Sequence, residues 1–217
     1  MILDDRIFRT APFTPRIDPP RTVVTVAPAV EPWLAADAEV LSALKLDSSD
    51  DAALVTLYLA AARRHFEKLT GLTLIDQTLK TTWDTTPTGT TLDLPRSPLG
   101  SITSATYLDS TGAIATFASA SYSAVNAGVA NCSGRLALKP DYDWPDLGDY
   151  AGAFSVTYVA GFGAAATDIP EDIRIALLML AAWYYEERLP VAVGNITSAL
   201  PHHLDAIVES HRVSFIA

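Results

Sequence analysis

The chain has 217 residues, 49% of them apolar, which is enough for one large domain or for a domain with a smaller one inserted. Its 15 basic and 25 acidic residues give a formal charge of −10, which argues against a protein that binds nucleic acid or an anionic membrane. Cys132 is the only cysteine, so an intrachain disulfide framework and a cysteine-based zinc cluster are excluded.

Residues 1–28 are predicted to form an extended arm. They contain five prolines and four arginines, a composition that resists both a helix and a central strand. The arm is expected to be either a disordered tail or a strap that orders against a partner. Its apolar cluster consists of Val23, Val24 and Val26.

Two helices are predicted between the arm and Gly71. Pro32 is expected to begin the first, which ends near Lys45 and has Leu34, Ala38, Leu41 and Leu44 on one face. Ser48 or Ser49 is expected to cap the second, and Gly71 to end it in a left-handed conformation. Its predicted apolar stripe comprises Leu54, Leu57, Tyr58, Ala61 and Leu69, and a solvated or intersubunit face is predicted for Arg63, Arg64, Glu67 and Lys68.

The hydrophobic period changes to alternation after Gly71. Short stretches rich in Thr, Tyr, Phe and β-branched residues predict strands, separated by turns that contain glycine or proline. The seven predicted strands are 74–83, 90–94, 102–108, 113–117, 121–125, 135–138 and 154–159. Strands of this length favour a small antiparallel sheet, barrel or sandwich.

Residues 170–190 are the most apolar stretch of the chain and predict its central helix. Asp168 is expected to cap it, and Pro190 to end it. The apolar run is shorter than the ~20 residues that a membrane span needs, so the helix is expected to be buried. An apolar helix surface beyond one face indicates either a central position in one helical domain or a second face against another copy of the chain. Contact with another copy is the hypothesis for Ile175, Met179 and Trp183, which lie outside the main apolar face.

The chain is predicted to end in a short helix with Leu204, Ile207 and Val208 on one face. Arg212, Val213, Ser214, Phe215 and Ile216 follow as an extended segment. Together the elements predict an α+β fold, with a helical domain of about four helices at residues 29–73 and 165–217 and an inserted antiparallel β-rich domain at 74–164.

Candidate chemical sites are weak, and no catalytic residue, cofactor or metal is predicted. Asp141, Asp143, Asp146 and Asp149 share a loop, but their spacing lacks the glycine and the bidentate Glu of a calcium loop. His202 and His203 are adjacent, so on a helix they point about 100° apart and do not form a zinc pair. His65 is expected to be a packed or interfacial histidine rather than a base.

Five stretches of the chain, taken in order and spacing, point to a known family: DDAALVTLYLAAARRHFEKLTGLTLIDQTL, LDLPRSPLGSITSATYLDSTG, FSVTYVAGFG, IPEDIRIALLMLAAWYYEERLPV and LPHHLDAIVESHRVSF. With them the sequence from residue 30 to 216 resembles the head-tail connector (adaptor) proteins of long-tailed bacteriophages and of phage-like gene transfer agents. The arm before Val30 lies outside the resemblance.

The resemblance implies a structural adaptor that forms a ring, expected to be dodecameric, between the portal and the next neck protein, a stopper or tail terminator. It implies no catalysis, assembly in the host cytoplasm and a final place in the neck of the particle. DNA would pass through the ring without specific binding, and acidic walls suit such a conduit because they repel phosphates. No membrane contact is expected.

Within that interpretation, Arg212–Ile216 is the candidate segment for docking on the portal, because an alternating tail can add a strand to a sheet edge. The alternative is a tail that folds back on its own helices. A second function class is a β-rich binding module for carbohydrate or another surface ligand, with Trp83, Trp144 and Tyr142 as stacking platforms. A hydrolase that uses His202 or His203 is the third.

Overall fold

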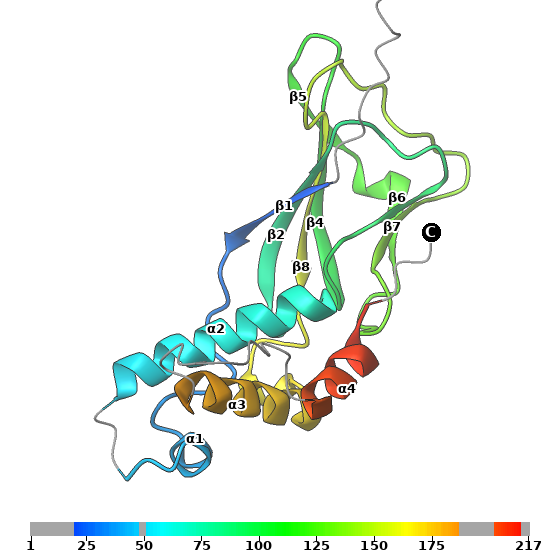
Figure 1. The fold of residues 1–217 in the computed structure, drawn as a ribbon. Coiled ribbons are helices and arrows are strands. Elements are labelled where there is room, and N and C mark those ends of the chain that lie inside the picture. The colour runs from blue at the N-terminus through cyan, green and yellow to red at the C-terminus, as the bar shows by residue number, and fades with distance from the viewer. Residues whose placement is uncertain (1–19, 48–50, 187–201, 214–217) are drawn as a thin grey trace, which may run out of the picture.

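The computed structural model describes residues 20–47, 51–186 and 202–213. The helices gather at one end of the molecule and two β-sheets at the other (Figure 1). The described residues contain four α-helices and eight strands, all paired antiparallel, so the predicted mixed α+β class is confirmed.

The larger sheet has the strand order β1-β2-β8-β4-β5. Its strands are β1 (Arg21–Val26), β2 (Gln77–Trp83), β8 (Phe154–Ala160), β4 (Leu99–Leu108) and β5 (Ile114–Phe117). The smaller sheet pairs β3 (Thr91–Asp93), β7 (Arg135–Leu138) and β6 (Tyr122–Val125) in the order β3-β7-β6. A 3₁₀ turn, Ser119–Ser121, precedes β6. Each of the seven predicted strands corresponds to an observed one.

Apolar and hydroxyl side chains alternate along β8, and the apolar ones form the core between the two sheets. Phe154, Val156 and Tyr158 are fully buried in the core of the β region, whereas Ser155 and Thr157 alternate with them and face the other side of the sheet. Leu79 on β2 and Leu136 on β7 contribute to the same core from both sheets. One face of the larger sheet is therefore apolar and packed, and the opposite face is rich in hydroxyls.

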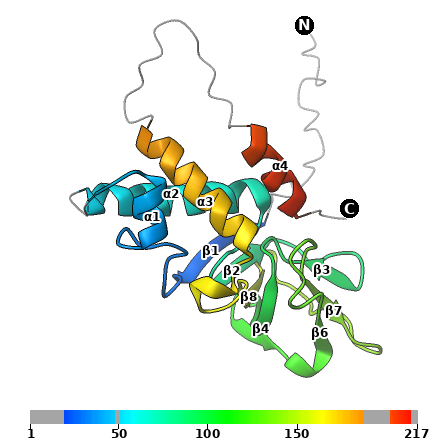
Figure 2. The same ribbon diagram turned by 90° about the horizontal axis from the view of Figure 1, so that it is seen from below.

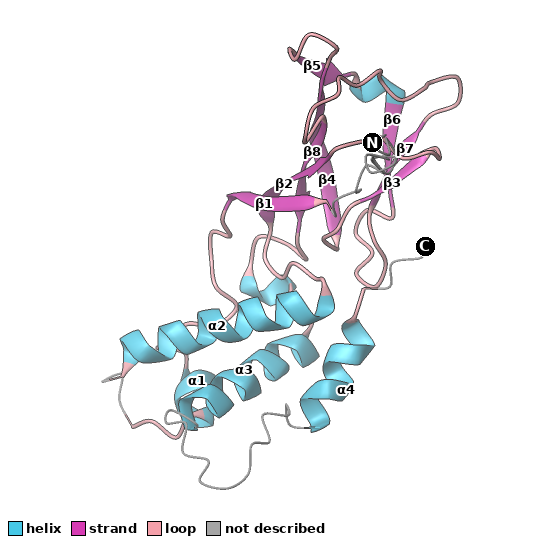
Figure 3. Cartoon of the chain, turned by 45° about the horizontal axis from the view of Figure 1, so that its top comes forward, coloured by secondary structure: helices cyan, strands magenta, loops and turns pink. Residues whose placement is uncertain are grey.

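Strand β1 comes from the segment predicted as an extended arm. Its residues pair with β2, with Val23 opposite Lys80 and Val24 opposite Leu79. The segment is extended, as predicted, but its partner is the chain's own sheet, where it forms an edge strand beside β2 (Figure 3). Because β1 precedes the helices, the larger sheet also draws on residues outside the predicted inserted domain. Residues 1–19 of the arm lie outside the described part of the chain.

The helices of the described residues pack against one another in one group, apart from the strands (Figures 2 and 3). They are α1 (Ala38–Ala43), α2 (Ala52–Thr70), α3 (Glu171–Glu186) and α4 (His202–His211). Their core contains Phe66 of α2, Leu177 and Leu180 of α3, and Leu204 and Val208 of α4, so the predicted apolar face of the last helix is confirmed.

Helix ends agree in part with the prediction. Gly71 ends α2 at φ 79°, in the left-handed conformation that favours glycine, as predicted. The first helix is much shorter than predicted, because residues 31–37 form turns held by a 2.8 Å hydrogen bond from the Leu34 N–H to the Asp37 carboxylate. Asp168 accepts the Ala165 N–H and closes the 3₁₀ turn Ala166–Asp168, so its predicted role as the cap of α3 is wrong.

The residues expected at two other helix ends lie outside the described part of the chain. They are Ser48 and Ser49, expected at the start of α2, and Pro190, expected at the end of α3.

The buried face of α2 differs from the prediction. Its buried residues are Val55, Leu59, Ala62, Arg63, Phe66, Glu67 and Thr70. The predicted apolar stripe is therefore wrong in part. Leu57 and Ala61 lie exposed on the surface, whereas Leu69 packs against the helical core and Tyr58 contacts the tyrosines of α3. Arg63 and Glu67, predicted to lie on a solvated or intersubunit face, are instead interior residues.

Candidate interaction surfaces

The first candidate surface is the α3 stripe, which we define as Ile175, Met179 and Trp183. These residues recur every four positions and therefore follow one side of the helix. Ile175 is 54% exposed and Met179 is 38% exposed, whereas Trp183 is partly buried and packs against the helical core. Leu177, on the opposite side of α3, is only 2% exposed. Two of the three predicted intersubunit residues thus present apolar side chains to the surface.

The contact between α2 and α3 is aromatic and partly polar. His65 shares a hydrogen bond with the Tyr184 hydroxyl and stacks on its ring. Tyr58 contacts both Tyr184 and Tyr185. Burial raises the pKa of the Tyr184 hydroxyl. His65 is therefore a packed histidine in this structure, in line with the prediction.

A buried network of charges lies where the helices meet the start of the β region. The Arg63 guanidinium donates to both Glu31 oxygens at 2.7 and 3.1 Å and to Glu67 at 3.0 Å. Glu67 in turn accepts the Leu74 N–H at 3.0 Å. Arg96 donates to the backbone carbonyl of Glu67 at 2.8 Å. The network thus connects α2 to the segments on either side of it in the chain.

The electrostatics of this network reflect its burial. Burial raises the pKa of the Glu67 carboxyl, and the Arg63 charge and the Leu74 N–H offset this only in part. Burial also works against the charge of Arg63, but its hydrogen bonds and the charges of Glu31 and Glu67 prevail and raise the pKa of the guanidinium. Ion pairs of this kind orient the elements that they join. Removal of one partner lowers the stability of the fold, because the other charge is left buried without compensation.

The predicted docking segment begins inside the molecule. The Val213 N–H donates to the Thr70 carbonyl at 2.8 Å, and its side chain, 6% exposed, is part of the helical core beside Gly71. The Arg212 side chain is exposed and pairs with Glu209 at 3.0 Å. Ser214, Phe215 and Ile216 lie outside the described residues. In this structure Val213 therefore contacts the chain's own helices, which is the arrangement that the alternative for this segment describes.

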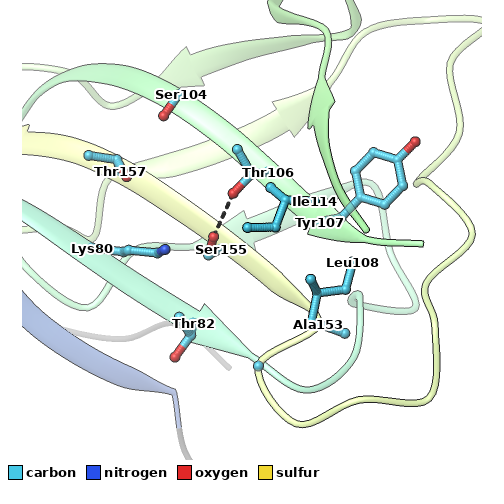
Figure 4. A pocket seen from close by; sticks show the side chains of 11 residues that line it. Lys80, Thr82, Ser104, Thr106, Tyr107, Leu108, Ile114, Ala153, Ser155 and Thr157 are labelled. Atoms are coloured by element: carbon cyan, nitrogen blue, oxygen red, sulfur yellow. Dashed lines mark hydrogen bonds between the residues drawn. The ribbon is translucent and has the colours of Figure 1, made fainter. Parts of the chain in front are cut away.

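The outer face of the larger sheet forms a shallow trough, which the sequence did not reveal. It has a volume of about 400 Å³. We define the trough by its floor residues, Lys80 and Thr82 of β2, Ser104 and Thr106 of β4, and Ser155 and Thr157 of β8 (Figure 4). Thr106 and Ser155 share a hydrogen bond of 2.8 Å across the strands. The signal was present as alternation of hydroxyl residues, but only strand pairing places three such rows side by side.

Among the described residues that line the trough, Lys80 is the only charged one. Its side chain is exposed and points toward Ser155 in Figure 4. Within the described part of the chain it makes no ion pair. The β5 side of the trough ends at Ile114, which is 78% exposed. The trough therefore combines hydroxyls, the Lys80 ammonium group and an apolar rim.

The candidate chemical sites do not assemble. The aspartates of residues 141–149 are all exposed, and the described residues hold no group of three or more His, Cys, Asp or Glu able to bind a metal ion. The side chains of His202 and His203 lie outside the described residues. Within the described ranges, every helix is too short or too polar to be a membrane span.

Two of the three predicted stacking platforms are occupied by the protein itself. Trp144 stacks on Phe117 and meets Phe154 edge-on, and its indole N–H donates to the Gly89 carbonyl at 2.6 Å. Trp83 also packs against Phe154. Tyr142 is exposed, but it has no aromatic neighbour among the described residues with which to form a platform.

Residues 34–214 match the family described as head completion protein. Among curated proteins there is no match.

Three solved structures share the fold, each at 24% identity over 90% of this chain and 97% of the other. They are described as the neck of an empty gene transfer agent (GTA) particle computed with C6 symmetry, at a TM-score of 0.72, the neck of a native GTA particle computed with C12 symmetry, at 0.70, and the virion of a native GTA particle, at 0.70.

Proposed function

The chain belongs to the head completion protein family, and from this premise we propose that it is a structural adaptor in the neck of a phage or phage-like particle. In the particle it forms a ring between the portal and the next neck protein. The particle is assembled in the host cytoplasm. The family match over residues 34–214 carries the proposal. Its fold likeness to chains of GTA necks computed with C6 and with C12 symmetry supports a ring, for which we propose twelve subunits.

The α3 stripe supports the ring part of the proposal. In a closed ring each subunit offers two different surfaces to its two neighbours, so an apolar surface beyond the core is expected. Ile175 and Met179 supply such a surface on a helix whose other side is fully engaged in the core. We assign Ile175, Met179 and Trp183 to the contact between subunits.

We assign the end of the chain, Arg212–Ile216, to the contact with the portal. The residues of this segment have different roles. Val213 is the anchor, because its N–H and side chain are held by the helical core. The residues after it supply the contact with the portal. Arg212 borders the contact with an exposed guanidinium that lies beside Glu209.

The charge of the chain supports a conduit without affinity for DNA. A formal charge of −10 on every subunit gives the ring a strongly negative field, which repels phosphates and lets the duplex pass. The role is structural, with no catalytic step and no cofactor. The carbohydrate-binding alternative gains no support, because Trp83 and Trp144 pack against Phe154.

The test is reconstitution with the portal of the same particle. Purified chain and portal rings are mixed and examined by electron microscopy, and ring-on-ring complexes are expected. A chain that leaves the portals bare, while both components are folded, overturns the adaptor role. A monomer in the absence of portal does not, because a ring can require its template.

A further inference from the structure

The trough on the larger sheet has chemistry that fits a specific part of a second copy of this chain. We propose that it receives the acidic loop, residues 141–149, of the neighbouring subunit in the ring. This inference rests on the ring proposed above and gives it a second contact, in the β region, separate from the α3 stripe.

The trough selects for a carboxylate flanked by aromatic or apolar groups. Its floor offers the hydroxyls of Ser and Thr residues and a single ammonium group, that of Lys80, which has no ion-pair partner in the described residues. Apolar side chains stand on both sides of it. Ile114 on β5 is 78% exposed, and Val23, which lies directly opposite Lys80 on β1, is 62% exposed.

The acidic loop offers the complementary groups. Asp141 and Asp143 are exposed on either side of Tyr142, whose ring is also exposed. The loop is pinned close by, because the Trp144 indole packs against Phe117 and Phe154 and donates to Gly89. A loop held in this way loses little conformational entropy on binding. Carboxylates and an aromatic ring are thus presented together on a fixed support.

The two surfaces face different ways on one subunit. Trp144, and with it the start of the loop, packs on the face of β8 that carries Phe154. Lys80 and Ser155 lie on the other face of the same sheet, since side chains alternate between faces along a strand. The start of the loop therefore lies on the side of the sheet away from its own trough, and in a head-to-tail arrangement it can meet the trough of a neighbour.

Local charge complementarity allows another copy to be the occupant although the chains repel each other overall. A chain with a formal charge of −10 repels its own kind, so each interface needs local pairs of opposite sign. Lys80 and the exposed Asp141 and Asp143 provide such a pair without breaking any ion pair that the described part of the subunit contains.

The experiment exchanges the charges of trough and loop in the full-length chain. One variant carries Lys80→Glu, and the other carries Asp141→Lys with Asp143→Lys. Each alone is expected to lose rings on the portal, because like charges then meet at every interface. Circular dichroism checks that each variant folds.

A mixture of the two variants is expected to restore rings in which they alternate. The carboxylate that the first variant has in its trough then meets the lysine-bearing loop of the second. The Lys80 that the second variant keeps meets the native Asp141 and Asp143 of the first, so charges of opposite sign face each other at every interface.

Lys45→Glu, an exposed charge reversal just after α1, is the control that is expected to assemble. If the wild type forms rings and both single variants also do, the trough contact is overturned while the adaptor role stands. The trough contact is also overturned if each variant alone loses rings and the mixture does not restore them. It is overturned as well if the variants form intact rings that no longer bind the portal, because the trough would then contact the portal rather than a neighbouring subunit. Failure of the wild type itself refutes the adaptor role and this inference together.

Discussion

Opposite sides of α3 should respond in opposite ways to the same substitution. Leu177 is 2% exposed in the helical core, and Ile175, two residues earlier, is 54% exposed. We compare Leu177→Asp with Ile175→Asp, which introduce the same carboxylate into the same helix. The first is expected to destroy the fold, and the second to keep the fold and lose the ring.

The magnitudes follow from the burial of each side chain. Leu177→Asp loses about 1.5–3 kcal/mol of side-chain burial and adds the cost of a buried, unpaired charge, a total of at least about 4–5 kcal/mol. Since domains are stable by only about 5–15 kcal/mol, this variant is expected to unfold or nearly so. A surface change such as Ile175→Asp stays within about 0.5 kcal/mol.

Thermal melting and ring assembly measure the two effects separately. For a chain of this size about 1 kcal/mol shifts Tm by about 2–4 °C, so Ile175→Asp should melt within about 2 °C of the wild type. Leu177→Asp should melt at least about 10 °C lower or show no transition. Only Ile175→Asp should then be folded and yet fail to form rings on the portal.

Two results would refute this reasoning. Normal melting of Leu177→Asp would mean that the side of α3 assigned to the core is not buried. Normal ring assembly by a folded Ile175→Asp variant would remove the α3 stripe from the subunit interface, whatever the outcome at Leu177.

Three further predictions concern the end of the chain, the buried charges and pH. Removal of residues 214–217 should leave melting unchanged, because the Val213 anchor stays, and should abolish binding to portals in a co-sedimentation assay; retained binding would contradict the docking role. Arg63→Met should lower the free energy of unfolding in urea by about 3–5 kcal/mol, because the Glu67 carboxylate is left buried without its charged partner. The double variant with Glu67→Gln should recover part of that loss, because the charge is removed and the amide oxygen still accepts the Leu74 N–H. A cost of the double variant equal to that of the single one would contradict this. Although burial opposes the effect, the hydrogen bond from His211 lowers the pKa of Asp172, so Asp172 stabilises the fold above its ordinary pKa of 3.8 and loses this effect as pH falls through the lower, folded-state value. The stability difference between wild type and Asp172→Asn should therefore disappear in acid, and a difference that persists there would argue against the pair.

Strands were predicted well because their alternation is local. In β8 the apolar residues Phe154, Val156 and Tyr158 alternate with Ser155 and Thr157, and the apolar ones are fully buried in the structure. The alternation in the sequence therefore indicates which residues face the core. The prediction of the buried face of α2 failed in part because charged residues take up some of its core positions. Arg63 and Glu67 occupy core positions as a charge network with Glu31, and a hydrophobicity pattern assigns charged residues to solvent.

The surfaces were predictable only in part. Ile175 and Met179 could be chosen because α3 has more apolar residues than one buried face needs, which is a property of the sequence. The burial of Val213 could not be foreseen, because it depends on Gly71 and Thr70, which are far away in the chain.

The sequence by itself determined the class of elements, their order and the acidic character of the chain, because hydrophobic period and charge are local and additive. Only the tertiary structure decided that β1 joins the larger sheet, that Arg63 is interior and that Lys80 lies in a trough of hydroxyls. Each of these depends on which distant strand or helix comes to lie beside a residue. Pairing across the chain determines whether a charged or hydroxyl side chain meets water, a partner or another subunit.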